Sequence, residues 1–213
     1  MSGPSVRLNK AQPDKNLYVL LTDTGTLFTT LIKNVTSAPY NHASLAMDAE
    51  LNHLFSFGRR IPTNPLSAGF VEEDVYEGTF SHYPNTRCAL LKLRVNEDQC
   101  AEAWRTIRSF QQNRQAYRYN LLGLFGVMFQ YELRRKNAFF CSQFVAEALT
   151  RAGLALWDRP SALVTPDDFL RHGSFELIYE GMLYDYPLLD GDRVPLVPSF
   201  DRASFAGDKR LIV

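Results

Sequence analysis

The sequence predicts an α+β domain, because strand-like and helix-like segments come in separate runs rather than in strict alternation. Three observations lead to this prediction. Short apolar strands recur in the first third of the chain, a strand at residues 88–95 runs into an amphipathic helix, and a second buried helix spans residues 140–152. The chain has 213 residues, of which 46% are hydrophobic and 22% are charged, and this suits one domain with a sizeable core.

The first third of the chain carries most of the strand signals. Residues 17–22 (LYVLLT) predict a strand, and apolar residues at helical spacing predict a short helix at residues 26–35. Residues 43–47 and 53–57 read as two strands around a short turn, which is typical of a hairpin. The prolines that follow favour a loop at residues 61–69.

The rest of the chain carries the clearest helix signals. Residues 96–112 are amphipathic, and Asn96 is placed to cap their first turn. Residues 140–152 predict a second helix, which Gly153 ends. A third helix is expected to begin at Thr165, with a proline in its first turn. Two further segments complete the prediction: a mostly helical stretch at residues 117–136 that is broken by Gly123 and Gly126, and a late strand at residues 175–179.

Composition excludes several classes of function. Lys plus Arg and Asp plus Glu number 23 each, so the basic excess of a general nucleic-acid binder is missing. The longest apolar run, residues 121–129, is about half of the ~18 residues that a membrane span requires. Residues 1–16 are polar and are expected to be frayed. We expect residues 17–213 to form a single cytoplasmic domain with a peripheral C-terminal extension.

The three cysteines do not predict a disulfide framework, and no Cys/His cluster has the spacing of a zinc site. We therefore expect reduced thiols, no metal and no cofactor. Cys88 opens a strand and Cys100 lies on the apolar side of a helix, so both read as buried thiols.

Cys141 differs because it lies in the first turn of the helix at residues 140–152. Unpaired N–H groups and the positive end of the helix dipole stabilise a thiolate there. The alternative for Cys141 is a small buried apolar side chain.

A candidate base for this thiol precedes it in the sequence. On the strand that starts at His42, the imidazole shares one face with Ser44 and Ala46, while Ala43, Leu45 and Met47 share the other. His42 therefore opens a face of small residues, against which a helix is able to pack closely and bring a side chain to the imidazole. The alternative is a half-buried histidine with satisfied hydrogen bonds. Whether Cys141 and His42 meet is decided in space rather than in sequence.

The hairpin at His42 and the helix of Cys141 also carry a resemblance to a known family. The matching stretches, in order, are residues 17–26 (LYVLLTDTGT), 40–59 (YNHASLAMDAELNHLFSFGR), 68–71 (AGFV), 119–123 (YNLLG), 140–149 (FCSQFVAEAL) and 165–169 (TPDDF). The chain resembles the circularly permuted branch of the NlpC-type papain-like hydrolases, which includes YiiX-like proteins and the lecithin:retinol acyltransferase group. In that branch the histidine strand comes before the cysteine helix, as it does here.

The resemblance implies a permuted papain-like fold, in which the helix that carries the nucleophilic cysteine packs on an antiparallel sheet. It also implies that Cys141 attacks a carbonyl to form an acyl-enzyme, with His42 as general base. The first-turn N–H of Cys141 would then help to hold the oxyanion.

Related enzymes place an orienting polar residue on the strand after the histidine strand, and the matching position here is Ser56. A five-residue turn, residues 48–52, would pair Met47 with His53 and put Ser44 opposite Ser56, on the face of His42. A four-residue turn would instead turn Phe55 and Phe57 inward. A serine orients an imidazole less strongly than a carboxylate does.

Tyr119, close to the cysteine helix, and Gln143, two residues after Cys141, are candidate substrate-binding residues; a core tyrosine and an exposed helix position are the alternatives. Glu72, Glu73, Asp74 and Glu77 read as solvated surface. The basic segment at residues 105–136, which includes the apolar run, makes membrane contact possible, but a buried helix with a solvated rim is favoured.

Three functions remain open. The first is a cysteine hydrolase that cleaves an amide or ester bond in a small peptide-like or acyl substrate. The second is a lipid-directed acyltransferase or thioesterase, in which residues 121–129 would line an acyl pocket. The third is a papain-like fold kept for binding, for which a serine at position 56 is the main support. The sequence does not indicate an oligomeric state.

Overall fold

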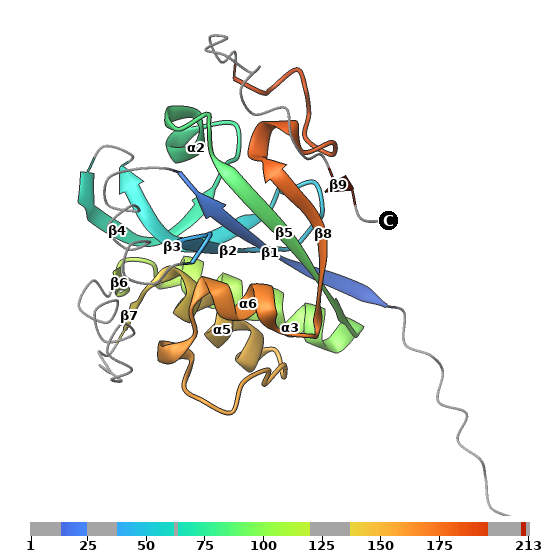
Figure 1. The fold of residues 1–213 in the computed structure, drawn as a ribbon. Helices are drawn as coiled ribbons and strands as arrows, with labels where there is room; N and C mark the ends of the chain where they lie inside the picture. The colour runs from blue at the N-terminus through green and yellow to red at the C-terminus, as the bar shows by residue number, and fades with distance from the viewer. Residues whose placement is uncertain (1–13, 25–37, 62–63, 120–136, 196–209, 212–213) are drawn as a thin grey trace, which may run out of the picture.

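The computed structural model describes residues 14–24, 38–61, 64–119, 137–195 and 210–211. Within them, seven strands form one antiparallel sheet in the order β4-β3-β2-β1-β5-β8-β9, so the predicted α+β class is confirmed (Figure 1). The strands are β1 (Lys15–Asp23), β2 (His42–Ala46), β3 (Leu54–Ile61), β4 (Asn64–Glu73), β5 (Arg87–Val95), β8 (Phe175–Met182) and β9 (Arg210–Leu211).

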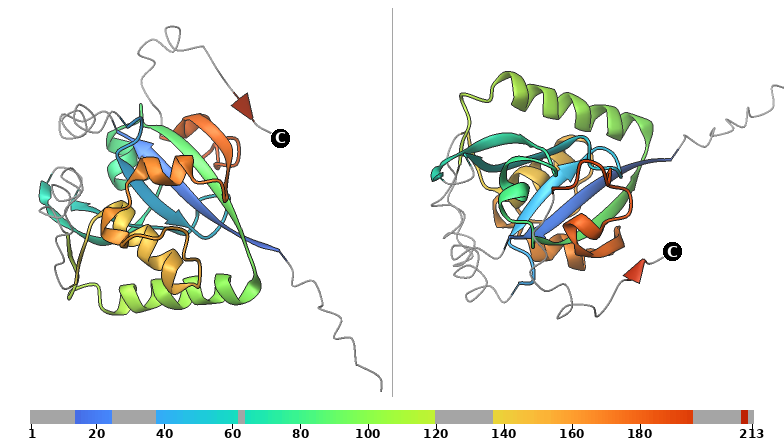
Figure 2. Two further views of the ribbon diagram at one scale, coloured as in Figure 1. Left: turned by 60° about the horizontal axis from the view of Figure 1, so that its bottom comes forward. Right: turned by 90° about the horizontal axis from the view of Figure 1, so that it is seen from above.

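Helices cover both faces of this sheet (Figures 1 and 2). On one face lie α3 (Glu97–Gln112), α5 (Cys141–Arg151) and α6 (Pro166–Arg171), whose apolar side chains share a core cluster with the sheet. On the other face, α2 (Gly78–His82) and the segment that follows β8 enclose a second cluster. The sheet is therefore buried from both sides, and its central strands carry near-continuous apolar runs.

The helix ends follow from local sequence. Asn96 caps α3 through a capping box with Gln99, and Thr165 caps α6 through the same motif with Asp168. Gly153 has φ +80°, a left-handed conformation that glycine adopts without strain just beyond the end of α5. These predicted caps are confirmed. By contrast, the residue before α5 is Phe140, which offers no capping side chain, so the first-turn N–H groups are left for other partners.

Several predicted boundaries need correction. Residues 64–69 are not a loop: they begin β4, which is an edge strand and so tolerates the missing N–H of a proline. Residues 118–119 form a short strand, β6 (Arg118–Tyr119), parallel to β7 (Ala138–Phe139), rather than part of a helix. β1 begins at Lys15, within the segment 1–16 that was expected to be frayed, and residues 1–13 of that segment lie outside the described residues. The helix predicted at residues 26–35 and most of that at residues 117–136 lie outside the described residues.

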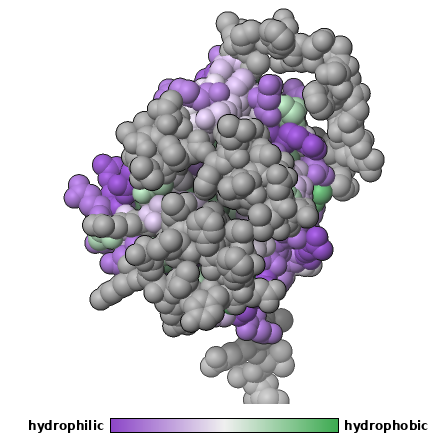
Figure 3. Space-filling model, turned by 60° about the vertical axis from the view of Figure 1, so that its left-hand side comes forward, coloured by the Kyte–Doolittle hydropathy of each residue, from purple (hydrophilic) through white to green (hydrophobic). Residues whose placement is uncertain are grey.

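The described surface is largely polar. Figure 3 shows the side of the molecule on the left of Figure 1, where the coloured residues are mainly hydrophilic with scattered apolar ones. Among the described residues, Leu188 is the one large hydrophobic side chain classed as exposed, at 50%. No helix in this part of the chain is both long and apolar enough to span a membrane.

Candidate active site

The β2–β3 hairpin has the predicted register. Leu45 lies opposite Phe55 and Ala46 opposite Leu54, and the Met47 N–H donates to the carbonyl of His53 at 3.0 Å. The five-residue turn is thereby confirmed, with the Asp48 carboxylate accepting hydrogen bonds from backbone N–H groups at its far end. Ser56 consequently shares a sheet face with Ser44 and His42.

The helix that carries Cys141 packs on the opposite face from the one we predicted. Ala43 and Leu45 share a core cluster with Phe144 and Val145 of α5, whereas His42 and Ser44 alternate with them and face the other way. The physical reason is polarity. The apolar stripe of α5 fits the apolar face of β2, and packing on Ser44 and His42 would bury polar groups against hydrocarbon. Cys141 is therefore brought to the imidazole at the start of the strand.

Cys141 meets β2 where that strand is not paired with β3. β2 and β3 pair at Leu45 and Ala46, although β2 begins three residues before Leu45. Alternate N–H groups of β2 point toward β3, as that of Met47 does. The N–H of Ala43 points the same way, beyond the paired region, and it hydrogen-bonds the sulfur of Cys141 instead.

Cys141 is buried, with 3% of the residue exposed. Its sulfur is 4.0 Å from the carbonyl oxygen of Asn41. Burial raises the pKa of the thiol, but the charge of His42, a hydrogen bond between the two side chains, and the N–H groups of Ala43 and Ser142 outweigh burial and lower it. Burial instead raises the pKa of Cys88 and of Cys100. Cys141 is thus set apart from the other two thiols by its surroundings.

His42 is held by a carboxylate. Its Nε2 lies 3.0 Å from Oε1 of Glu73, with 21% and 12% of the two side chains exposed. Burial lowers the pKa of His42, but the charges of Glu73 and Cys141 and its hydrogen bonds to both raise it to about 10. Burial raises the pKa of Glu73, and the charge of His42 with the hydrogen bonds around the carboxylate lowers it overall. Because Nε2 faces Glu73, Nδ1 is the ring nitrogen left for Cys141.

Glu73 reaches His42 across an intervening strand. It lies on β4, which pairs with β3 and not with β2. The space for its side chain comes from small residues on β3: a Cβ added at Gly58 would lie 3.3 Å from Oε1 of Glu73 and 3.2 Å from Oγ of Ser56. Three side chains from α5, β2 and β4 are thereby brought together as cysteine, histidine and glutamate.

The hydrogen-bond partner of His42 is Glu73 and not Ser56, the residue predicted to orient the imidazole. The side chain of Ser56 is fully buried on the expected face, but its hydroxyl makes no hydrogen bond of ordinary geometry. It lies near enough to Glu73 to contribute to the lowered pKa of that carboxyl. The residue that contacts His42 is Glu73, which we had expected to be solvated surface. The available signal was the strand-forming pair Phe70 and Val71, which comes directly before the two glutamates.

The two candidate substrate-binding residues both lie near the start of α5. Tyr119 pairs with Phe139, two residues before Cys141, and packs at the edge of the main core. Gln143 is half-buried in the first turn of α5, and its Oε1 is buried without a hydrogen-bond partner. Gln143 thus holds an unused acceptor two residues from the thiol.

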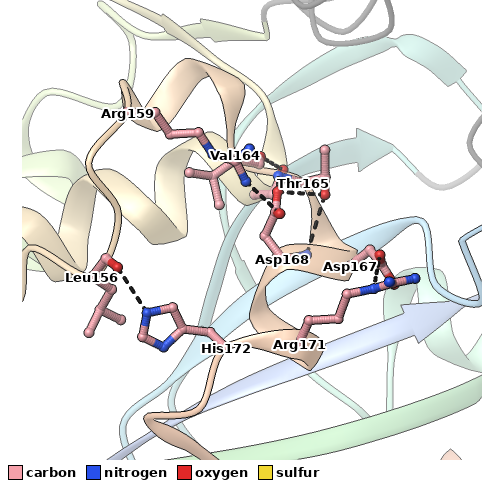
Figure 4. A network of polar contacts seen from close by, with 9 residues as sticks. Leu156, Arg159, Val164, Thr165, Asp167, Asp168, Arg171 and His172 are labelled. Carbon is pink, nitrogen blue, oxygen red and sulfur yellow. Dashed lines mark hydrogen bonds and ion pairs between the residues drawn. The ribbon is translucent and has the colours of Figure 1, made fainter.

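A polar network braces the segment that leads into α6 (Figure 4), and Ser142 ties the start of α5 to it. The hydroxyl of Ser142 donates to the carbonyl of Val164 at 2.7 Å, next to the Thr165 cap. Asp168 completes the capping box and also pairs with Arg159 at 2.5 Å. Two further contacts brace this segment: Arg171 with Asp167 at 2.6 Å, and His172 with the carbonyl of Leu156 at 2.8 Å. The backbone beside Cys141 is therefore fixed from a second direction.

Within the described residues, no group of three or more His, Cys, Asp or Glu side chains is arranged to hold a metal ion. No protein-family model, curated protein or solved structure matches this chain.

Proposed function

We propose that this protein is a cysteine hydrolase of the permuted papain-like type, which cleaves an amide or ester bond in a small peptide-like or acyl substrate. The observation that carries the proposal is the contact of His42 with both Cys141 and the Glu73 carboxylate. Covalent catalysis requires a nucleophile, a base and a group that orients the base, and these three residues fit those roles in that order: Cys141, His42 and Glu73. We place the protein in the cytoplasm, where thiols stay reduced.

In the first half of the reaction, the Cys141 thiolate attacks the carbonyl carbon of the substrate and forms a C–S bond. The negative charge moves to the carbonyl oxygen, and the first-turn N–H groups of α5 are suited to bind it because no side chain caps them. When the oxyanion collapses, the C–N or C–O bond breaks. The His42 imidazolium gives its proton to the leaving amine or alcohol, and a thioester remains on Cys141.

In the second half, neutral His42 takes a proton from a water molecule, whose oxygen attacks the thioester carbon. Collapse of the second tetrahedral intermediate breaks the C–S bond and releases the carboxylic acid. The proton on His42 and the charge on Cys141 restore the starting ion pair. Glu73 stabilises the imidazolium throughout and fixes the ring with Nδ1 toward the sulfur.

The binding-only alternative loses its main support, because it depended on serine as the orienting group. A carboxylate at 3.0 Å is the stronger partner for an imidazolium. The lipid-directed alternative depended on residues 121–129, which lie outside the described residues. Identifying the acyl group carried by Cys141 separates a peptide-like substrate from a lipid.

Trapping the acyl-enzyme tests the proposal. The protein is mixed with p-nitrophenyl esters of short and long acids, quenched in acid, and examined by mass spectrometry. We expect one acyl group on the Cys141 peptide of the wild type and of Cys100→Ala, which removes a half-buried thiol elsewhere. We expect none on Cys141→Ala and slow formation on His42→Ala. Equal labelling of Cys141→Ala and the wild type, or no adduct with any ester, would contradict the proposal.

A further inference from the structure

The carboxylate of Glu73 is held at both oxygens, by residues from the same strand. Oε1 faces Nε2 of His42, and Oε2 accepts a hydrogen bond from the hydroxyl of Ser44 at 2.5 Å. Ser44 lies two residues after His42 on β2, so its side chain projects from the same sheet face. It is fully buried.

The hydrogen bond from Ser44 matters because the position of the Glu73 carboxylate is otherwise poorly fixed. Glu73 belongs to β4 and must extend over β3 to reach β2, so its backbone does not by itself fix where the carboxylate lies. Ser56 of β3, which shares this sheet face, makes no hydrogen bond of ordinary geometry. Ser44 is thus the group, among the described residues, that anchors the oxygen not used by His42. An anchored carboxylate keeps Oε1 in line with the imidazole.

From these contacts we propose that Ser44 is a positioning residue: it acts on His42 through Glu73, by holding the carboxylate that charges the imidazole. This inference rests on the proposed function for its catalytic meaning, but the charge on His42 is measurable without turnover. The chain offers a matched control on the other side of the histidine. Thr22 of β1 is paired with His42, is fully buried, and has a hydroxyl without a hydrogen bond.

The experiment is an NMR titration of the His42 ring in the ring-labelled 213-residue protein, which has four histidines. We expect Ser44→Ala to lower the pKa of His42 by roughly one unit, because a carboxylate that is free to turn away from Nε2 stabilises the imidazolium less. In the Glu73→Gln background, Ser44→Ala should cause no further shift, because Ser44 acts only through the carboxylate. Thr22→Val should titrate as the wild type does.

Ser44→Cys keeps a side chain of similar shape with a weak donor, and should shift the pKa in the same direction if Ser44→Ala does not fold. Wild-type titration of His42 in the folded serine variant, or an equal shift with and without Glu73, would overturn the inference. Its failure is distinct from that of the proposed function. If acyl-enzyme forms but Ser44 has no effect, only the positioning is wrong; if Ser44 behaves as expected but no acyl-enzyme forms, only the hydrolase is wrong.

Discussion

Replacing Glu73 by glutamine removes the charge beside His42 and keeps the size of the side chain. Two unit charges 3.0 Å apart interact by about 5 kcal/mol at an effective dielectric constant of ~20. One pKa unit corresponds to 1.36 kcal/mol, so the pKa of His42 should fall by roughly 3 to 4 units. From about 10 in the wild type, the pKa should then fall to between about 6 and 7.

The assay combines the titration of the His42 ring with the rate of acyl-enzyme formation at several pH values. Near pH 8 the wild type keeps its imidazolium, while Glu73→Gln has lost it, so the thiolate of Cys141 lacks its cation. We expect acylation at that pH to slow by roughly 10²-fold or more. The matched control is Glu72→Gln, the adjacent and exposed acid on β4, whose carboxylate accepts from Gln111. It should leave both measurements unchanged.

The same substitution has a signed effect on stability. The pKa of His42 is raised in the folded state, so its contribution is complete below its unfolded pKa of about 6.5 and is lost as pH rises through about 10. The pKa of Glu73 is lowered, so its contribution is lost as pH falls through its folded value. The difference in free energy of unfolding between wild type and Glu73→Gln should therefore be largest between about pH 4.5 and 6.5. An unchanged His42 pKa, or a difference that grows above pH 8, would refute the reasoning.

Three further outcomes are expected. Iodoacetamide at mildly acidic pH should label Cys141 before the other two cysteines, and His42→Ala should move that labelling to higher pH; equal labelling of all three thiols by peptide mapping would contradict the lowered pKa. Gly58→Ala should lower the acylation rate by crowding the carboxylate beside His42. The control is Gly69→Ala, at the paired position on β4, whose new methyl group would meet only the end of an exposed arginine and should keep the wild-type rate. A slower rate in Gly69→Ala than in Gly58→Ala would be inconsistent with the site. Thr165→Ala should reduce the free energy of unfolding in urea by about 1 kcal/mol through loss of the α6 cap, and no change would argue against that cap.

Local chemistry in the sequence determined several parts of this protein. Alternation along residues 43–47 and 53–57 predicted the hairpin, and its turn length fixed which residues share a face with His42. Asn96 and Thr165 predicted two helix starts because their side chains bond N–H groups three residues away. Cys141 was recognisable as a special thiol because a helix N-terminus is a local feature.

Tertiary structure alone decided which group orients the histidine and on which face the cysteine helix packs. Glu73 contacts His42 only because β4 pairs with β3 in one register and because Ser56 and Gly58 leave room over that strand. Both conditions involve residues of different strands. Which strands pair, and in which register, is set by burial and by hydrogen bonds that no local sequence pattern specifies. A glutamate in an acidic stretch looks like solvated surface until the neighbouring strands bury it beside a cation.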